Sequence, residues 1–157
     1  SLFGYSVKAA VNTSITLKTV KNTGGSYTQI TSAAPNDTVT LQIHCNNAVE
    51  NVGGISITVY YDSAVLAFRE QSYTSHIVDD SASFLVQPIA AGNDKGARIN
   101  IVWDTSAQNT NLSGLIFSLA FDVLGSAESG NTEFTAEVKS FFLSYKGEGR
   151  QALTPGS

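Results

Sequence analysis

The sequence predicts an all-β sandwich, and three observations support that prediction. Apolar and polar residues alternate with a period of two through much of the chain, which is the pattern of strands that bury one face. Clusters of glycine, proline, asparagine, aspartate and serine separate these stretches, as turns do. No window of about 12 residues has the period of a helix. The 157 residues, of which 42% are apolar, suffice for one domain with its own core.

The alternation is clearest in five stretches of the middle and C-terminal parts of the chain. They cover residues 39–45, 55–61, 99–104, 115–123 and 134–138. In each stretch one set of side chains is apolar, so we expect that set to form the interior of the sandwich. The expected core contains Val39, Leu41, Ile43, Cys45, Ile55, Ile57, Val59, Trp103, Leu115, Phe117, Leu119 and Phe121.

The N-terminal third predicts three further strands, at residues 7–11, 15–20 and 27–31. The turn sequence Asn-Thr-Gly-Gly at residues 22–25 indicates a hairpin between the last two. About nine to eleven short strands with regular turns are typical of a β-sandwich, and we expect a single domain over residues 1–157. The first residues, 1–4, have the character of the start of an excised module.

Composition excludes several classes of partner. The net charge is −4, and the nine basic residues are scattered singly, so the sequence has no basic patch for nucleic acid. The sequence has no run of about 18 apolar residues, so it predicts no membrane-spanning helix. The single cysteine, Cys45, has no partner for an intramolecular disulfide and continues the apolar set of its strand. We therefore expect Cys45 to be a buried, inert side chain.

The sequence contains no recognisable catalytic or metal-binding motif. The only histidines are His44 and His76, and no HxH, HExxH or CxxC spacing is present. The adjacent carboxylates Asp79 and Asp80 tend to diverge, which does not suit a glycosidase pair. No calcium-loop sequence is found. We expect a protein that is not an enzyme and has no catalytic residues, no bound metal and no cofactor.

Three segments resemble the cohesin family, in the order in which that family has them. Residues 35–41, Pro-Asn-Asp-Thr-Val-Thr-Leu, are similar to the opening of its second strand. Residues 52–66, with Tyr-Asp-Ser-Ala-Val-Leu at their end, resemble a core strand followed by a turn and a return to the core. Residues 112–123 resemble a later strand of the family. Ser63 stands where the family usually has proline, and residues 20–34 form a longer link than usual, which we interpret as an added hairpin.

The resemblance implies a nine-stranded jelly roll of two sheets that receives a dockerin. A dockerin is a small helical module of an enzyme or scaffoldin that carries its own calcium, and the cohesin itself needs no cofactor. The family implies an extracellular module, secreted or attached to a bacterial surface, that assembles cellulosome-like complexes, with no nucleic-acid partner and no membrane insertion. The dockerin face would be the outer side of the third, fifth, sixth and eighth strands of the jelly roll.

Val102 is the expected anchor of that face, because it is the large apolar residue in the outward set of its strand. Ser56 and Thr58 supply hydrogen-bonding positions beside it. Residues of the fifth strand follow if Phe84 and Val86 point inward, and those of the eighth strand follow if Phe134, Ala136 and Val138 do. The expected partner-binding residues are Ser56, Thr58, Leu85, Gln87, Ile89, Asn100, Val102, Asp104, Phe141 and Leu143.

Two other classes of protein stay open from the sequence. A carbohydrate-binding module often has the same jelly roll, and a fold alone does not assign function. Such modules present exposed, coplanar aromatic side chains, whereas Trp103 belongs to an inward set and Tyr60, Tyr73 and Tyr145 fall on different elements. A structural or adhesin surface domain is the remaining class.

Overall fold

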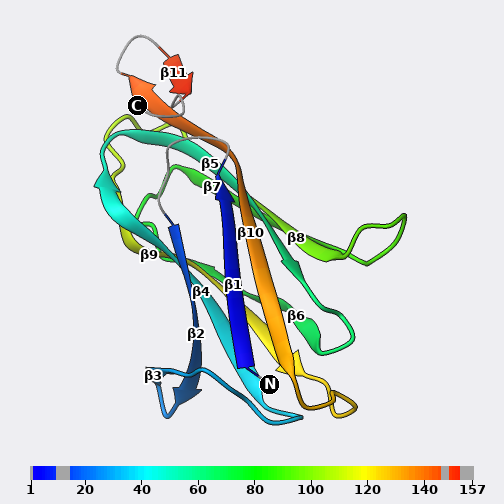
Figure 1. Cartoon of the computed structure of the whole chain (residues 1–157). Helices are drawn as coiled ribbons and strands as arrows, with labels where there is room; N and C mark the ends of the chain where they lie inside the picture. The colour runs from blue at the N-terminus through cyan, green and yellow to red at the C-terminus, as the bar shows by residue number, and fades with distance from the viewer. Residues whose placement is uncertain (1, 10–14, 146–148, 153–157) are drawn as a thin grey trace.

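The computed structural model describes residues 2–9, 15–145 and 149–152, which form eleven strands and no helix (Figure 1). The strands are β1 (Leu2–Ala9), β2 (Ile15–Thr23), β3 (Ser26–Gln29), β4 (Thr38–Val49), β5 (Val52–Tyr61), β6 (Leu66–Ser75), β7 (Ala82–Ile89), β8 (Ala97–Thr105), β9 (Leu112–Val123), β10 (Asn131–Tyr145) and β11 (Gly149–Ala152). The all-β prediction is confirmed. Residues 10 and 11 of the predicted first strand lie outside the described part. Over the described residues, no helix long and apolar enough to cross a membrane is found.

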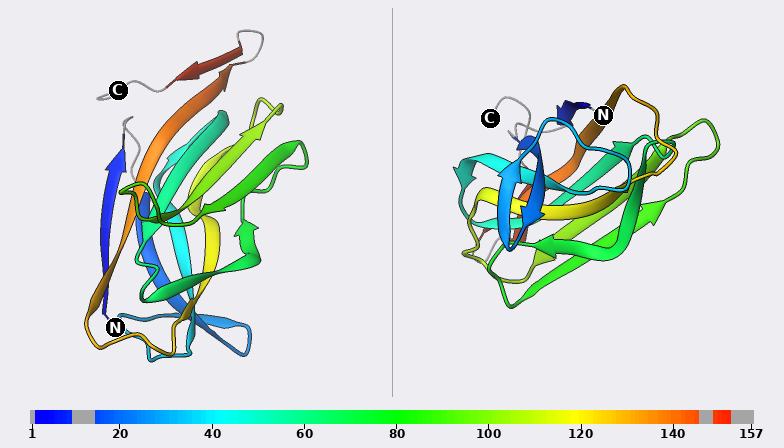
Figure 2. Two further views of the ribbon diagram at one scale, coloured as in Figure 1. Left: turned by 90° about the vertical axis from the view of Figure 1, so that its right-hand side faces the viewer. Right: turned by 90° about the horizontal axis from the view of Figure 1, so that it is seen from below.

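The strands form two sheets that pack face to face. Sheet A has the order β1-β10-β5-β8-β7, with β11 paired to β10, and sheet B has the order β3-β2-β4-β9-β6. Figure 2 shows the strands of sheet A side by side in its left view. The pairing of β1 with β10 is parallel, and the other named strand pairs are antiparallel. The four-residue strands β3 and β11 bring the total from the expected nine to eleven.

Strands β2 and β3 form the hairpin that the sequence predicted. Their pairing ends at Thr23 and Ser26, which leaves Gly24 and Gly25 as a two-residue turn. Both glycines have positive φ, +61° and +88°, which the favoured two-residue hairpin turns require and which glycine adopts without a Cβ clash. The added hairpin lies at the edge of sheet B and adds no strand to sheet A.

The inward side chains of both sheets fill one apolar interior. Trp103 is 1% exposed, and Phe117 and Phe121 are fully buried. Rings from opposite sheets meet there: Phe84 of β7 stacks on Phe117 of β9 at a centroid distance of 5.2 Å, and Phe121 lies 5.1 Å from Phe134 of β10. These aromatic pairs join the two layers through both burial and ring contact.

All of the predicted core residues are buried except Leu115. Along β4 and β9, Ile43 pairs with Phe117 and the next residue, His44, pairs with Leu115, so Ile116 is an extra residue in β9. Such a bulge shifts the alternation by one position. Ile116 and Phe117 are therefore both buried, and Leu115 moves to the partly exposed outer side of sheet B. The prediction for Leu115 was wrong because it assumed an unbroken period of two.

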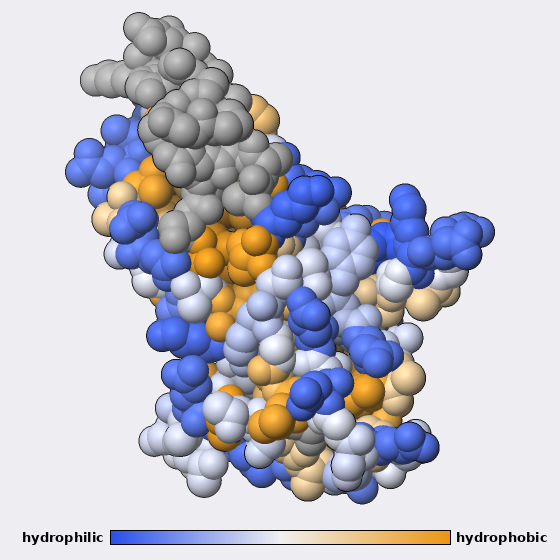
Figure 3. Space-filling model, in the orientation of Figure 1, coloured by the Kyte–Doolittle hydropathy of each residue, from blue (hydrophilic) through white to orange (hydrophobic). Residues whose placement is uncertain are grey.

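The sandwich is less tightly closed along the edge where β1 faces β2. Figure 3 shows apolar side chains reaching the surface along this seam, and Tyr5 and Val7 of β1 are each 39% exposed. A hydrogen bond of 2.5 Å between the Tyr5 and Thr19 hydroxyls connects the two sheets across it. The parallel pairing of β1 with β10 thus closes one side of the core only in part.

The register at the β9 bulge predicts that truncation of Ile116 and truncation of Leu115 lower the stability by different amounts. Ile116→Ala should lower the free energy of unfolding by about 2–5 kcal/mol, because it leaves a cavity in the core. Leu115→Ala, the matched control, should lower it by less than half as much, since that side chain is partly in water. Urea denaturation of both variants measures the difference. A larger loss for Leu115→Ala would contradict the register.

Cys45 should resist thiol reagents in the folded protein. The side chain is 3% exposed, burial raises the pKa of its thiol, and Sγ lies 3.1 Å from the Asn47 carbonyl oxygen. A raised pKa leaves less of the reactive thiolate at any pH below it. Labelling with a chromogenic disulfide reagent should be slow without denaturant and fast in urea. Rapid labelling of the native protein would refute this placement.

Candidate partner-binding face

The outer side of sheet A carries most of the residues that the sequence predicted for a partner. Four neighbouring strands, β10, β5, β8 and β7, form the broad part of this sheet. Because all pairs among them are antiparallel, their outward residues line up in rows across the sheet. One row runs Leu85, Val102, Ser56 and Ser140, and the next runs Gln87, Asn100, Thr58 and Glu137. We call this surface the sheet A face.

An exposed apolar pair occupies one row of the sheet A face. Leu85 of β7 and Val102 of β8 are direct cross-strand partners, and they are 61% and 41% exposed. Their strand neighbours Val86 and Ile101 point into the core, which fixes Leu85 and Val102 on the outside. Phe84 and Val86 thus point inward, which was the condition for placing Leu85 on the outer side.

Polar side chains continue these rows toward β10 and are already hydrogen-bonded to one another. Thr58 Oγ1 donates to Asn100 Oδ1 at 2.9 Å, and the Ser56 and Ser140 hydroxyls are 2.6 Å apart. Thr58 is only 4% exposed although it lies on the outer side, so its hydroxyl is held by Asn100 more than by water. These contacts fix side-chain rotamers before any partner arrives, which reduces the entropy that binding must overcome.

The other predicted residues of β7 and β8 lie on either side of the Leu85–Val102 pair. Gln87 is exposed and pairs with Asn100, and Ile89 is partly buried and pairs with Arg98. Asp104 lies at the opposite end of β8, between Ser83 and Gly54. The structure therefore brings Ser56, Thr58, Leu85, Gln87, Ile89, Asn100, Val102 and Asp104 onto one surface.

The outward positions predicted for Phe141 and Leu143 are corrected by the structure. Phe141 is fully buried in the core, and Leu143 packs against the core and is only partly exposed. The cause is a bulge in β10: Val138 pairs with Ile57 and Ser140 pairs with Ser56, so Lys139 is an extra residue. Beyond this bulge the inward and outward positions exchange.

The outer side of β10 carries three side chains that were not predicted for the face, two of them at this bulge. Glu137, Lys139 and Ser140 lie on the outer side of β10, and Lys139 Nζ is 3.1 Å from a Glu137 carboxylate oxygen. The consecutive polar residues Lys139 and Ser140 interrupt the alternation, and that interruption is the signal in the sequence. The sheet A face thus has an apolar row, a hydrogen-bonded polar centre and an ion pair toward β10, an arrangement suited to contact with another macromolecule.

The structure argues against a carbohydrate-binding platform of exposed aromatic side chains on this face. Trp103 is buried, as the sequence predicted, and Tyr73 packs edge-on against Phe84 at 5.8 Å. Tyr60 is partly buried on β5, and the side chain of Tyr145 lies outside the described part. Among the described residues, no group of three or more histidine, cysteine, aspartate or glutamate side chains is placed to hold a metal ion.

Comparison with solved structures gives the same architecture. A type I cohesin–dockerin complex from Clostridium thermocellum matches with 15% identity, covering 89% of this chain and 92% of that chain, at a TM-score of 0.57. The solution structure of a cohesin from Clostridium acetobutylicum is 18% identical, with coverage of 96% and 97% and a TM-score of 0.57. A cohesin module from a Clostridium perfringens family 33 glycoside hydrolase is 9% identical, with coverage of 92% and 91% and a TM-score of 0.55.

A search of curated proteins finds no match. The family model for the cohesin domain matches residues 26–152, which is most of the chain and includes every strand of sheet A except β1. The resemblance seen in three segments of the sequence therefore extends over the sandwich from β3 to β11, and the chain belongs to the cohesin family.

Proposed function

We propose that this cohesin domain is a non-catalytic receptor that binds a dockerin on its sheet A face. The observation that carries the proposal is the exposed row of Leu85 and Val102 beside the hydrogen-bonded pairs Thr58–Asn100 and Ser56–Ser140. The Clostridium thermocellum relative was solved as a cohesin–dockerin complex. The role that follows is assembly of extracellular, cellulosome-like complexes, with the domain secreted or held at a bacterial surface.

The chemistry of the face suits a helical partner. A helix presents one apolar stripe, and a sheet face with a short apolar row gives that stripe a complementary surface. Leu85 and Val102 would supply the desolvated centre, where most of the binding free energy of an interface is concentrated. The polar pairs and the Glu137–Lys139 ion pair would surround that centre and determine orientation.

Val102→Asp should weaken dockerin binding by at least about tenfold, or about 1.4 kcal/mol or more. The added carboxylate would lose its water on binding without a partner charge to replace it. Isothermal titration calorimetry with a calcium-loaded dockerin measures the loss. The melting temperature should barely change, since Val102 lies outside the core.

Thr28→Asp is the matched control, because it places the same charge at an exposed, β-branched position of β3 in the other sheet. It should leave dockerin affinity unchanged. Full-strength binding by Val102→Asp would move the interface away from the sheet A face. An equal loss in both variants would indicate a general charge effect.

Removal of calcium should separate the two partners by acting on the dockerin. With a chelator, the complex should dissociate on size-exclusion chromatography, because the dockerin loops lose their ions. The cohesin alone should keep its melting temperature within about 1 °C, since a protein that binds no calcium gains no stability from calcium. A large drop in the melting temperature of the isolated cohesin would reveal an ion site in this chain.

A further inference from the structure

The outer side of sheet B carries a trough on the opposite side of the molecule from the sheet A face. Its cavity has a volume of about 210 Å³ and lies over β4 and β9, between β3 and β6. Its lining includes Tyr27, Thr40, Gln71, Thr74, Ser118 and Ala120. We call it the sheet B trough.

Two irregular elements form the walls of the trough. One is the added hairpin, whose Tyr27 is 59% exposed and lines the cavity. The other is a large bulge in β6: residues 69–72 lie between Phe68 and Tyr73, whereas only Ala120 lies between their partners Phe121 and Leu119. A bulge of this size lifts the chain out of the sheet and re-aims its side chains.

Gln71, at the top of that bulge, has an unusual backbone. Its φ is +68°, and the other described non-glycine residues with positive φ are all asparagine or aspartate. Asparagine and aspartate tolerate this region, but glutamine rarely adopts it. Residues held in such conformations tend to occur at functional sites, where the surroundings impose them. Here the imposed conformation belongs to a residue that lines the trough.

The floor of the trough consists of short side chains. Thr40 pairs with Ala120 across β4 and β9, and Ser118 lies between Gln42 and Thr74 in the next row. Backbone groups of these central strands are already paired within the sheet. A ligand in the trough therefore meets hydroxyl and amide side chains, not a free strand edge such as an extended peptide uses.

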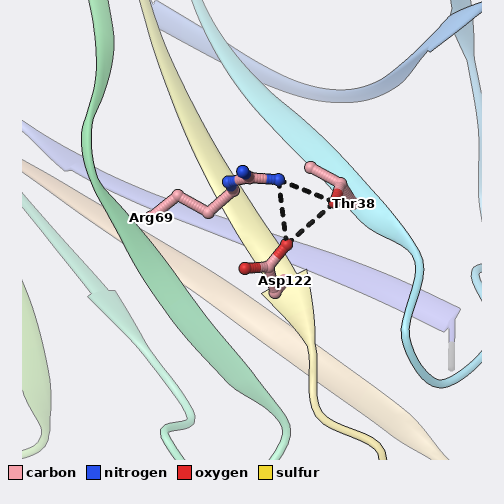
Figure 4. Close-up of polar contacts among 3 residues, drawn as sticks. All are labelled: Thr38, Arg69 and Asp122. Carbon is pink, nitrogen blue, oxygen red and sulfur yellow. Dashed lines mark hydrogen bonds and ion pairs between the residues drawn. The ribbon is translucent and has the colours of Figure 1, made fainter.

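Each end of the trough carries polar side chains that are already oriented. At one end, Thr38 Oγ1 donates to Asp122 Oδ1 at 2.8 Å, and Arg69 Nη1 lies 3.4 Å from the same carboxylate oxygen (Figure 4). At the other end, His76 Nε2 lies 2.7 Å from Ser118 Oγ. The trough thus joins one exposed aromatic ring to a series of hydrogen-bonding groups.

The lining of the trough has almost no net charge. Arg69 and Asp122 neutralise one another. Burial lowers the pKa of His76 and that of His44, which contacts Gln42 on the same face, so both imidazoles are neutral at pH 7. None of the residues that line the cavity is charged, and the cations near it, Arg69 and Lys18, lie outside that lining, so a neutral, hydroxyl-rich ligand matches it better than a polyanion.

From these features we propose that the sheet B trough binds a neutral polysaccharide chain. The ring of Tyr27 packs against one face of a sugar ring, and Gln71, Thr40, Thr74 and Ser118 exchange hydrogen bonds with its hydroxyl groups. The cavity is smaller than the roughly 300–1,000 Å³ of a pocket that encloses a small molecule, so it takes one sugar at a time from a longer chain. The site is independent of the dockerin face.

Affinity electrophoresis tests this site with the intact domain. Native gels that contain soluble xylan, galactomannan or hydroxyethyl cellulose should retard the protein in at least one case, and polygalacturonate, a charged polysaccharide, should not. Tyr27→Ala should weaken the retardation at least about tenfold, the effect of losing an aromatic anchor. Tyr27→Phe should retain it, because the ring is kept. Both variants should bind dockerin normally, whereas Val102→Asp should be retarded normally.

Gln71→Gly separates a role in binding from a role in stability, because the melting temperature and the retardation are measured on the same variant. Glycine keeps the left-handed backbone without strain and removes the amide, so the melting temperature should stay or rise while retardation weakens. Absence of retardation by every neutral polysaccharide, or retardation that Tyr27→Ala does not change, would overturn the proposal. Retardation by polygalacturonate alone would overturn the neutral assignment.

Discussion

Burial of one face of every central strand is the constraint on which the rest of this structure depends. Trp103, Phe117 and Phe121 fill the space between the sheets, and the strand neighbours of Trp103 and Phe121 point outward. The strands cannot rotate or slip by one residue without exposing this set. Two flat outer surfaces are the consequence, and each is assembled from strands that are distant in sequence.

Bulges decide what those two surfaces present. The extra residue Lys139 in β10 sends Phe141 inward and leaves Ser140 beside Ser56 on the sheet A face. The extra residues in β6 raise Gln71 above the floor of the sheet B trough. A flat sandwich with unbroken alternation would have Phe141 on its surface and no wall beside Ala120. Local irregularity thus supplies the specific chemistry, and the regular core supplies the rigidity that holds it in place.

The two surfaces differ in the kind of partner that their chemistry suits. The sheet A face has Leu85 and Val102 as a compact apolar centre, which favours a protein helix with an apolar stripe. The sheet B trough has one exposed ring, Tyr27, among hydroxyl and amide groups, which favours a polar, uncharged chain. Because the core separates them, a module with both would hold an enzyme-bearing partner on one side and a polysaccharide on the other.

The sequence by itself determined the fold class, the hairpin at Gly24 and Gly25, nearly all of the core and the family, because period-two patterning and turn residues are local signals. It also placed Val102 and Leu85 on the outside, since their neighbours are apolar. Only the tertiary structure decided the positions of Leu115, Phe141 and Leu143. A bulge is a mismatch in the pairing of two strands, so it is defined only when both strands are in place. The trough likewise became visible only when β3, β4, β6 and β9 were brought together, because no segment of the chain contains more than a part of it.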